Sequence, residues 1–114
     1  MNRERFAKIV AEVLDTLPEQ FRSRIQNVAV LVEDAPRGQR RLPKTLLLGL
    51  FHGTPATKKS VFQLPAGPDH VILYQRNIEA ICSSEAEIRE QIRRTVIHEL
   101  GHYFGLDEEQ LKDV

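Results

Sequence analysis

The chain has 114 residues, which is enough for one domain with a modest hydrophobic core and too few for two. Its 16 Lys and Arg residues balance its 16 Asp and Glu residues, so the formal charge is zero. This balance excludes the overall basic field that is typical of nucleic-acid-binding proteins. The single cysteine, Cys82, excludes an internal disulfide framework. We therefore expect a single domain over residues 1–114.

The sequence shows no apolar signal segment near Met1 and no run of about 18 apolar residues that could cross a bilayer. From these two features we expect a cytoplasmic protein without a membrane partner.

The first element is predicted to be an amphipathic helix over about residues 2–15. Its apolar side chains follow the i, i+3, i+4, i+7 spacing of one helix face: they are Phe6, Ile9, Val10, Val13, Leu14 and Leu17. Packing of this face on the domain's own sheet is favoured over partner binding, because a small domain needs every apolar stripe for its core. The stretch from Thr16 to Glu19 has the spacing of a capping box, which predicts a second short helix through about Arg24.

Four segments have the composition of β-strands. Residues 28–32 form a continuous apolar run, which predicts a buried strand, and residues 46–51 form the most apolar segment. Within the latter, Gly49 indicates a bulge or a close approach of another backbone. Residues 60–64 are predicted to form a short third strand, and residues 71–74 a fourth.

The loop over residues 37–44 carries four basic side chains, Arg37, Arg40, Arg41 and Lys44, and no acidic one. Contact with phosphates is one interpretation of this loop. A solvated connection between strands is favoured, because no aromatic side chain alternates with the charges and no helix presents them. We therefore expect no nucleic-acid partner.

Ser84 and Glu87 have capping-box spacing and predict the start of a long helix. Four apolar side chains continue along one side of this helix at i, i+4 spacing: Ile88, Ile92, Val96 and Leu100. From Thr95 to Phe104, Glu99 is the only formally charged residue, so this half is expected to be buried nearly all round. The elements predict an α+β fold in which a small mixed sheet of three to four strands packs against an N-terminal helix and a long helix.

The sequence His98-Glu99-Leu100-Gly101-His102 lies near the end of the long helix. Residues four apart lie on the same face of a helix, about one turn from each other, so the imidazoles of His98 and His102 can bind one metal ion. Glu99 projects beside this face, where a carboxylate can take a proton from a metal-bound water. Gly105 accepts a positive φ and can end the helix, so that the chain turns back and brings an acidic side chain to the ion.

The whole pattern from His98 to Glu108, H-E-x-x-H-x-x-G-x-x-E, resembles the metzincin form of the zincin signature. It is more closely similar to the small bacterial metzincin-like zincins, whose motif ends in Asp, and the run from Gly67 to Tyr74 shares this resemblance. The resemblance implies zinc as the cofactor, Glu108 as the third protein ligand and a zincin-like fold. It also implies that an exposed edge strand, either residues 46–51 or residues 60–64, pairs with an extended peptide.

Two features depart from the metzincin pattern. Position 108 holds Glu where metzincins usually have His and the small bacterial relatives usually have Asp, so Asp107 competes with Glu108 for the third-ligand position. The methionine-containing turn of full-sized metzincins does not follow the motif in this sequence, in which the only methionine is Met1.

The sequence therefore predicts a zinc-dependent metallopeptidase that acts on a peptide or protein substrate. His98, His102 and Glu108 would bind the zinc, water would take the fourth position, and Glu99 would be the general base. The alternative is a non-catalytic domain in which zinc stabilises a small core or mediates a protein contact. Glu99 favours catalysis, because a structural zinc has no use for a base. The substrate, the physiological metal and the oligomeric state are left open.

Five further side chains are weaker candidates. His52 and His70 are interpreted as solvated or hydrogen-bonded rather than as metal ligands or catalytic helpers. Tyr74 and Arg76 are candidates for binding a substrate carboxylate or an oxyanion. Cys82 is interpreted as a small packed side chain rather than a nucleophile, because no base is paired with it in the sequence.

Overall fold

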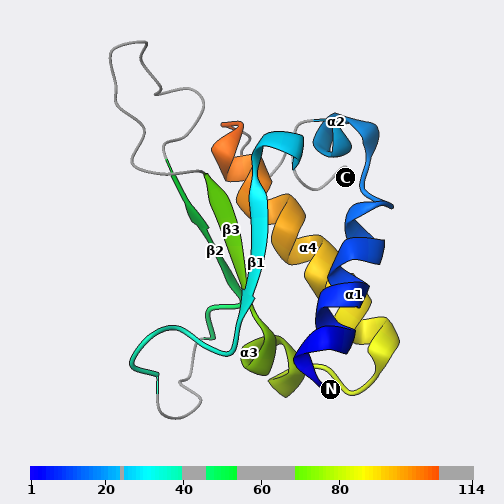
Figure 1. Ribbon diagram of the computed structural model, residues 1–114, viewed down its shortest axis with the longest axis vertical. Helices are drawn as coiled ribbons and strands as arrows, with labels where there is room; N and C mark the ends of the chain where they lie inside the picture. Colours follow the sequence, from blue (N-terminus) through cyan, green and yellow to red (C-terminus); the bar gives the residue numbers. More distant parts are fainter. Residues whose placement is uncertain (24, 40–45, 54–68, 106–114) are drawn as a thin grey trace.

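The computed structural model describes residues 1–23, 25–39, 46–53 and 69–105. The elements in these ranges are α1 (Arg3–Leu14), α2 (Glu19–Arg22), the 3-10 helix η1 (Ile25–Asn27), β1 (Ala29–Glu33), β2 (Gly49–His52), β3 (His70–Tyr74), α3 (Gln75–Ala80) and α4 (Glu85–Tyr103). The strands form one sheet in the order β1-β3-β2, in which β1 is parallel and β2 antiparallel to β3. Helices α1 and α4 lie on the same side of this sheet (Figure 1). The predicted α+β fold with a small mixed sheet is confirmed.

The predicted strand over residues 60–64 lies outside the described residues. Among the helices that the structure describes, none combines the length and the apolar character needed to cross a membrane.

Helix α1 forms where the apolar periodicity predicted it. The side chain of Asn2 caps its start by accepting a hydrogen bond from the backbone N–H of Arg5 at 2.7 Å. Its apolar face is buried in the chain's own core together with β3 and α4. The core residues of α1 are Phe6, Ile9, Val10 and Val13. This burial confirms that the stripe serves the domain's core.

The second helix is present, but its predicted capping box is wrong. Pro18 is the N-cap residue of α2, and it has no side-chain oxygen that could cap the helix. The hydroxyl of Thr16 donates instead to the carbonyl of Val13 at 2.8 Å. The same carbonyl also accepts from the backbone N–H of Thr16 at 3.0 Å, so Thr16 binds the end of α1 rather than an N–H group at the start of α2.

The strand predicted over residues 28–32 is an edge strand with one solvated face, not a fully buried strand. In the described sheet, β1 pairs with β3 alone. Its exposed and half-buried residues alternate, and Leu31 retains 46% of its accessible surface. The prediction failed because α1 and α4 cover one side of the sheet, so the apolar residues on the other face of β1 meet no helix in the described part of the chain.

Gly49 confirms the predicted close approach, although β2 begins at Gly49 itself rather than at residue 46. A Cβ atom at this position would lie 2.6 Å from Cγ2 of Thr95 and 3.0 Å from the carbonyl oxygen of Ile72. The first distance is far below van der Waals contact, so α4 approaches β2 as closely as it does only because residue 49 has no side chain.

We expect Gly49→Ala to lower the free energy of unfolding by about 1–3 kcal/mol, the usual range for overpacking. In an unstrained strand the change from glycine to alanine would stabilise the protein. A lower free energy of unfolding would therefore show that the added Cβ clashes with Thr95. The measurement is urea unfolding followed by circular dichroism. Adding Thr95→Ser removes the clashing methyl group and should restore part of the loss, whereas an unchanged midpoint for Gly49→Ala would contradict the close packing.

Helix α4 has the predicted start and end. The Oγ of Ser84 accepts a hydrogen bond from the backbone N–H of Glu87 at 3.1 Å. The carboxylate of Glu87 accepts from the backbone N–H and the hydroxyl of Ser83, and these bonds hold the pKa of Glu87 below its usual value. Gly105 follows the helix with a φ of 77°, as expected of a glycine that reverses the chain.

Candidate metal centre

The two histidines of the motif lie one turn apart near the C-terminal end of α4, as predicted. Their ring centroids are 4.6 Å apart and their planes are inclined at 68°. His98 is half-buried and His102 is exposed. Two imidazoles this close on one helix face can turn a nitrogen each towards one cation, and imidazole nitrogen is a preferred ligand of zinc. The two imidazoles therefore fit two of the ligand positions of a zinc ion.

The expectation that this half of α4 is buried nearly all round is wrong. Thr95, Val96, Ile97 and Leu100 are buried, whereas His102 is exposed. The reason is that α4 packs against the core with its apolar side, whereas His102 lies on the other side of the helix. The short distance between the two imidazoles therefore favours a metal at this helix, and the cost of burying them does not.

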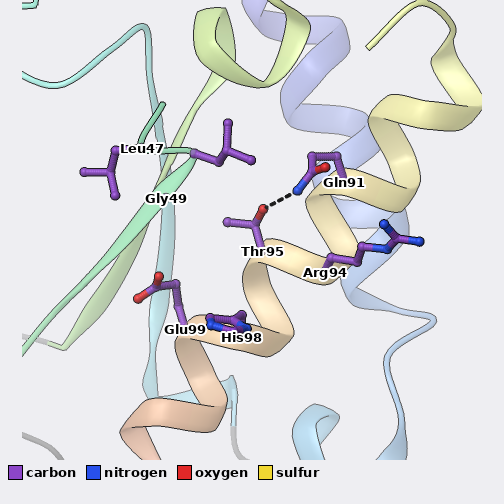
Figure 2. Close-up of a pocket in the computed structure, with 8 residues that line it drawn as sticks. Leu47, Gly49, Gln91, Arg94, Thr95, His98 and Glu99 are labelled. Atoms are coloured by element: carbon purple, nitrogen blue, oxygen red, sulfur yellow. Dashed lines mark hydrogen bonds between the residues drawn. The ribbon is translucent and has the colours of Figure 1, made fainter. Parts of the chain in front are cut away.

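The carboxylate of Glu99 is directed towards β2 (Figure 2). Its Oε2 accepts a hydrogen bond from the backbone N–H of Phe51 at 3.2 Å. The ring of Phe51 also packs on that of Tyr103, at 4.7 Å between centroids, so one residue of β2 contacts the motif helix at two points. The general-base candidate is therefore in contact with the strand that faces it across the site.

The N–H of Phe51 belongs to the edge of β2 that faces away from β3. The backbone N–H of Tyr74 donates to the carbonyl of Leu48 at 2.9 Å, which makes positions 48 and 74 a hydrogen-bonded pair of the antiparallel ladder. Such pairs alternate along the strands, so Leu50 and His52 also point their backbone groups at β3. The backbone groups of Gly49 and Phe51 point to the opposite side, the side on which Glu99 lies.

A cavity of about 250 Å³ lies between the start of β2 and α4. Leu47 and Leu48 are its apolar lining residues. Leu47 and Glu99 come from the two different sides of the cavity, one from the segment before β2 and the other from α4 (Figure 2). The other lining residues are Gly49, Gln91, Arg94, Thr95 and His98. Within it, Gln91 donates to the hydroxyl of Thr95 at 3.2 Å. The cavity thus places an apolar wall next to two of the three residues of the motif that carry chemistry.

Asn77 positions this apolar wall, and the sequence analysis missed it. Its side chain is fully buried on α3 and donates to the carbonyl of Leu47 at 2.9 Å. It also exchanges two hydrogen bonds with the side-chain amide of Gln39, at 2.7 and 3.1 Å. An Asn in a short helix gives no sequence signal of this role, because the role follows from burial beside a carbonyl that needs a donor.

Both candidates for the third ligand, Glu108 and Asp107, lie outside the described residues. Within residues 1–23, 25–39, 46–53 and 69–105, no group of three His, Cys, Asp or Glu side chains could hold a metal ion. The described part of the chain therefore supplies two ligand candidates and the candidate base.

His52 and His70 are directly opposite each other on β2 and β3, with their rings stacked 5.0 Å apart and inclined by 6°. The nitrogen lone pairs lie in the ring planes, so parallel stacked rings do not aim them at a common ion. His52 also lies on the opposite face of the sheet from Phe51, because successive strand residues alternate. The structure does not bring these two histidines to the motif.

The remaining candidates do not form part of the site. Tyr74 is 5% exposed, and burial, followed by the charge of Glu33, raises the pKa of its hydroxyl. Neither Tyr74 nor Arg76 lines the cavity. Cys82 packs partly against the core, and burial raises the pKa of its thiol, with a smaller contribution from Glu87. A raised thiol pKa favours the unreactive form, in agreement with a packed side chain.

Comparison with known proteins identifies the class. A model of the zincin-like metallopeptidases matches residues 25–114, and the chain therefore belongs to this family. Its fold is similar to that of a conserved hypothetical protein from Thermus thermophilus, with a TM-score of 0.64 and 20% sequence identity over 91% of this chain and 94% of that one. At this identity the likeness shows the fold alone. No curated protein matches the chain. Membership of the family implies zinc binding.

Proposed function

We propose that the chain is a zinc-dependent peptidase in which His98, His102 and Glu108 bind the metal and Glu99 is the general base. One observation carries the proposal: the rings of His98 and His102 lie 4.6 Å apart on α4, and His98 and Glu99 both line the cavity between α4 and β2. When bound, zinc supplies a Lewis acid that polarises a peptide carbonyl and lowers the pKa of a coordinated water.

Each residue has a separate task in this proposal. In it, His98 and His102 bind as neutral imidazoles, and the positive φ of Gly105, which is typical of a glycine that ends a helix, would let an acid beyond it approach them. Glu99 accepts a proton from the attacking water and passes it to the leaving amine. Its position one residue after His98 keeps its carboxylate on the cavity side of the helix.

The proposed substrate is an extended peptide that adds to the outward edge of β2. The backbone groups of Gly49 and Phe51 face away from β3 and can pair with such a peptide. A side chain of the peptide would then enter the cavity beside Leu47 and Leu48, which favours an apolar side chain at that position.

The exposure of His102 supports catalysis over the alternative of a structural zinc. A structural zinc is enclosed by four protein ligands, whereas a catalytic one keeps a position open for water. The exposed imidazole and the adjoining cavity leave access to a metal held at this place.

The experiment that tests the proposal is digestion of a peptide library, read by mass spectrometry, before and after removal of the metal. We expect cleavage by the zinc-loaded protein, loss of cleavage after chelation, and recovery when one equivalent of Zn²⁺ is returned. Return of Mg²⁺ is the control and should not restore cleavage, since magnesium prefers oxygen ligands. A fully zinc-loaded protein that cleaves no peptide would refute the proposal.

A further inference from the structure

We infer that Glu99 and an incoming peptide compete for the same backbone N–H, that of Phe51, so that docking of the peptide releases the catalytic carboxylate. The inference rests on the proposed function and adds a coupling between substrate binding and the availability of the base. It starts from the hydrogen bond of 3.2 Å between the Phe51 N–H and Oε2 of Glu99.

The backbone N–H of Phe51 can serve only one acceptor fully. Because Phe51 lies at a position whose N–H faces away from β3, this group is the donor that a strand added to β2 would use. A backbone amide has one hydrogen, so a peptide carbonyl and the Glu99 carboxylate cannot both have a full hydrogen bond to it.

Helix α4 lies close to the strand edge at this N–H group. Gly49 lets α4 approach β2 so closely that a Cβ there would lie 2.6 Å from Cγ2 of Thr95. One turn further along α4, Glu99 reaches β2 with its own carboxylate (Figure 2). The carboxylate therefore occupies the place on the strand edge where the carbonyl of an added strand would lie.

Docking of the peptide replaces one hydrogen bond of the Phe51 N–H by another. The hydrogen bond from the Phe51 N–H to Glu99 breaks, and one from the same N–H to the peptide carbonyl forms. The carboxylate of Glu99 is then released from β2 and can turn towards the proton of the attacking water. Before docking, the base is held on β2.

The test is peptide affinity of the metal-free protein, in which no turnover takes place. The probe is a fluorescein-labelled, acetylated pentapeptide with a central leucine between threonine and serine residues, and binding is read by fluorescence anisotropy. We expect Glu99→Ala to lower Kd by about 3- to 10-fold, because it removes a competing hydrogen bond. Glu99→Gln keeps an oxygen that can accept the bond and should stay within about twofold of the unchanged protein.

Two controls separate this effect from other causes. Glu4→Ala removes the same charge from an exposed position on α1 and should leave Kd unchanged. Phe51→Pro and Phe51→Ala both lose the ring, but only proline loses the N–H, and at this outward position it breaks no bond to β3. In the Phe51→Pro background, Glu99→Ala should no longer tighten binding, whereas in the Phe51→Ala background it should.

An unchanged or raised Kd for Glu99→Ala would overturn the inference, and so would equal tightening in the proline background. Failure of the Glu99→Ala protein to bind the peptide at millimolar concentration would overturn it as well. These measurements need no zinc, so their outcome is independent of whether the zinc-loaded protein proves to be a peptidase.

Discussion

Replacing His98 by alanine is expected to weaken zinc binding by about 100- to 1,000-fold and to abolish peptide hydrolysis. This loss of affinity corresponds to the contribution of one ligand to the free energy of zinc binding. His102→Ala should have the same effect, because the two imidazoles lie 4.6 Å apart and would share the ion. The measurement is competitive titration of zinc against a chromophoric chelator, with peptide cleavage followed in parallel.

The His102→Ala protein should fold normally, because His102 is exposed. Its free energy of unfolding, measured with urea, should stay within about 0.5 kcal/mol of that of the unchanged protein. The matched control is His52→Ala, an exposed histidine on the face of the sheet opposite to that of Phe51, which should leave zinc binding intact. Equal zinc affinity in the His98→Ala and unchanged proteins would exclude the assigned site.

Glu99→Gln is expected to keep the zinc and to lower kcat by about 100- to 10,000-fold, the range found for removal of a general base. An amide of the same size cannot take a proton at neutral pH, but its oxygen can still accept the hydrogen bond from the Phe51 N–H. Zinc content and kcat are measured on the same preparation, so that loss of metal cannot be mistaken for loss of the base.

The control for this variant is Glu90→Gln, which makes the same chemical change on the exposed face of α4, where Glu90 pairs with Arg94 at 3.0 Å. It should keep both zinc and hydrolysis. Hydrolysis at the full rate by Glu99→Gln would show that another group is the base.

The helices were predictable from the sequence because their signals are local. In α1 the apolar spacing alone defines the buried face, and in α4 the cap at Ser84 and the positive φ at Gly105 define the ends. The motif was predictable for the same reason, since the relation between His98 and His102 is fixed by one turn of helix.

The strands were harder to predict because their burial depends on distant parts of the chain. Five consecutive apolar residues from Val28 read as a buried strand, yet β1 is at the edge of the described sheet and exposes Leu31. Nothing within the segment reveals which of its faces a helix will cover.

The contacts that complete the site were not predictable at all. Phe51 and Glu99 are 48 positions apart in sequence, and Asn77 and Leu47 are 30 apart. Both contacts involve a backbone group of the segment around β2, and a backbone group carries no sequence signature. They depend on the register of β2 against β3 and on the approach of α4 at Gly49.

The metal centre is tested most directly by the X-ray absorption spectrum of the zinc-loaded protein beside its Glu108→Ala and Asp107→Ala variants. We predict one zinc per chain with two imidazole nitrogens at about 2.0–2.1 Å and oxygen ligands at about 2.0–2.2 Å, one of them from solvent. Glu108→Ala should change the oxygen ligands of the zinc in the spectrum, and Asp107→Ala should leave them unchanged. A spectrum with sulfur in the first shell, or with fewer than two imidazoles, would contradict the proposed centre.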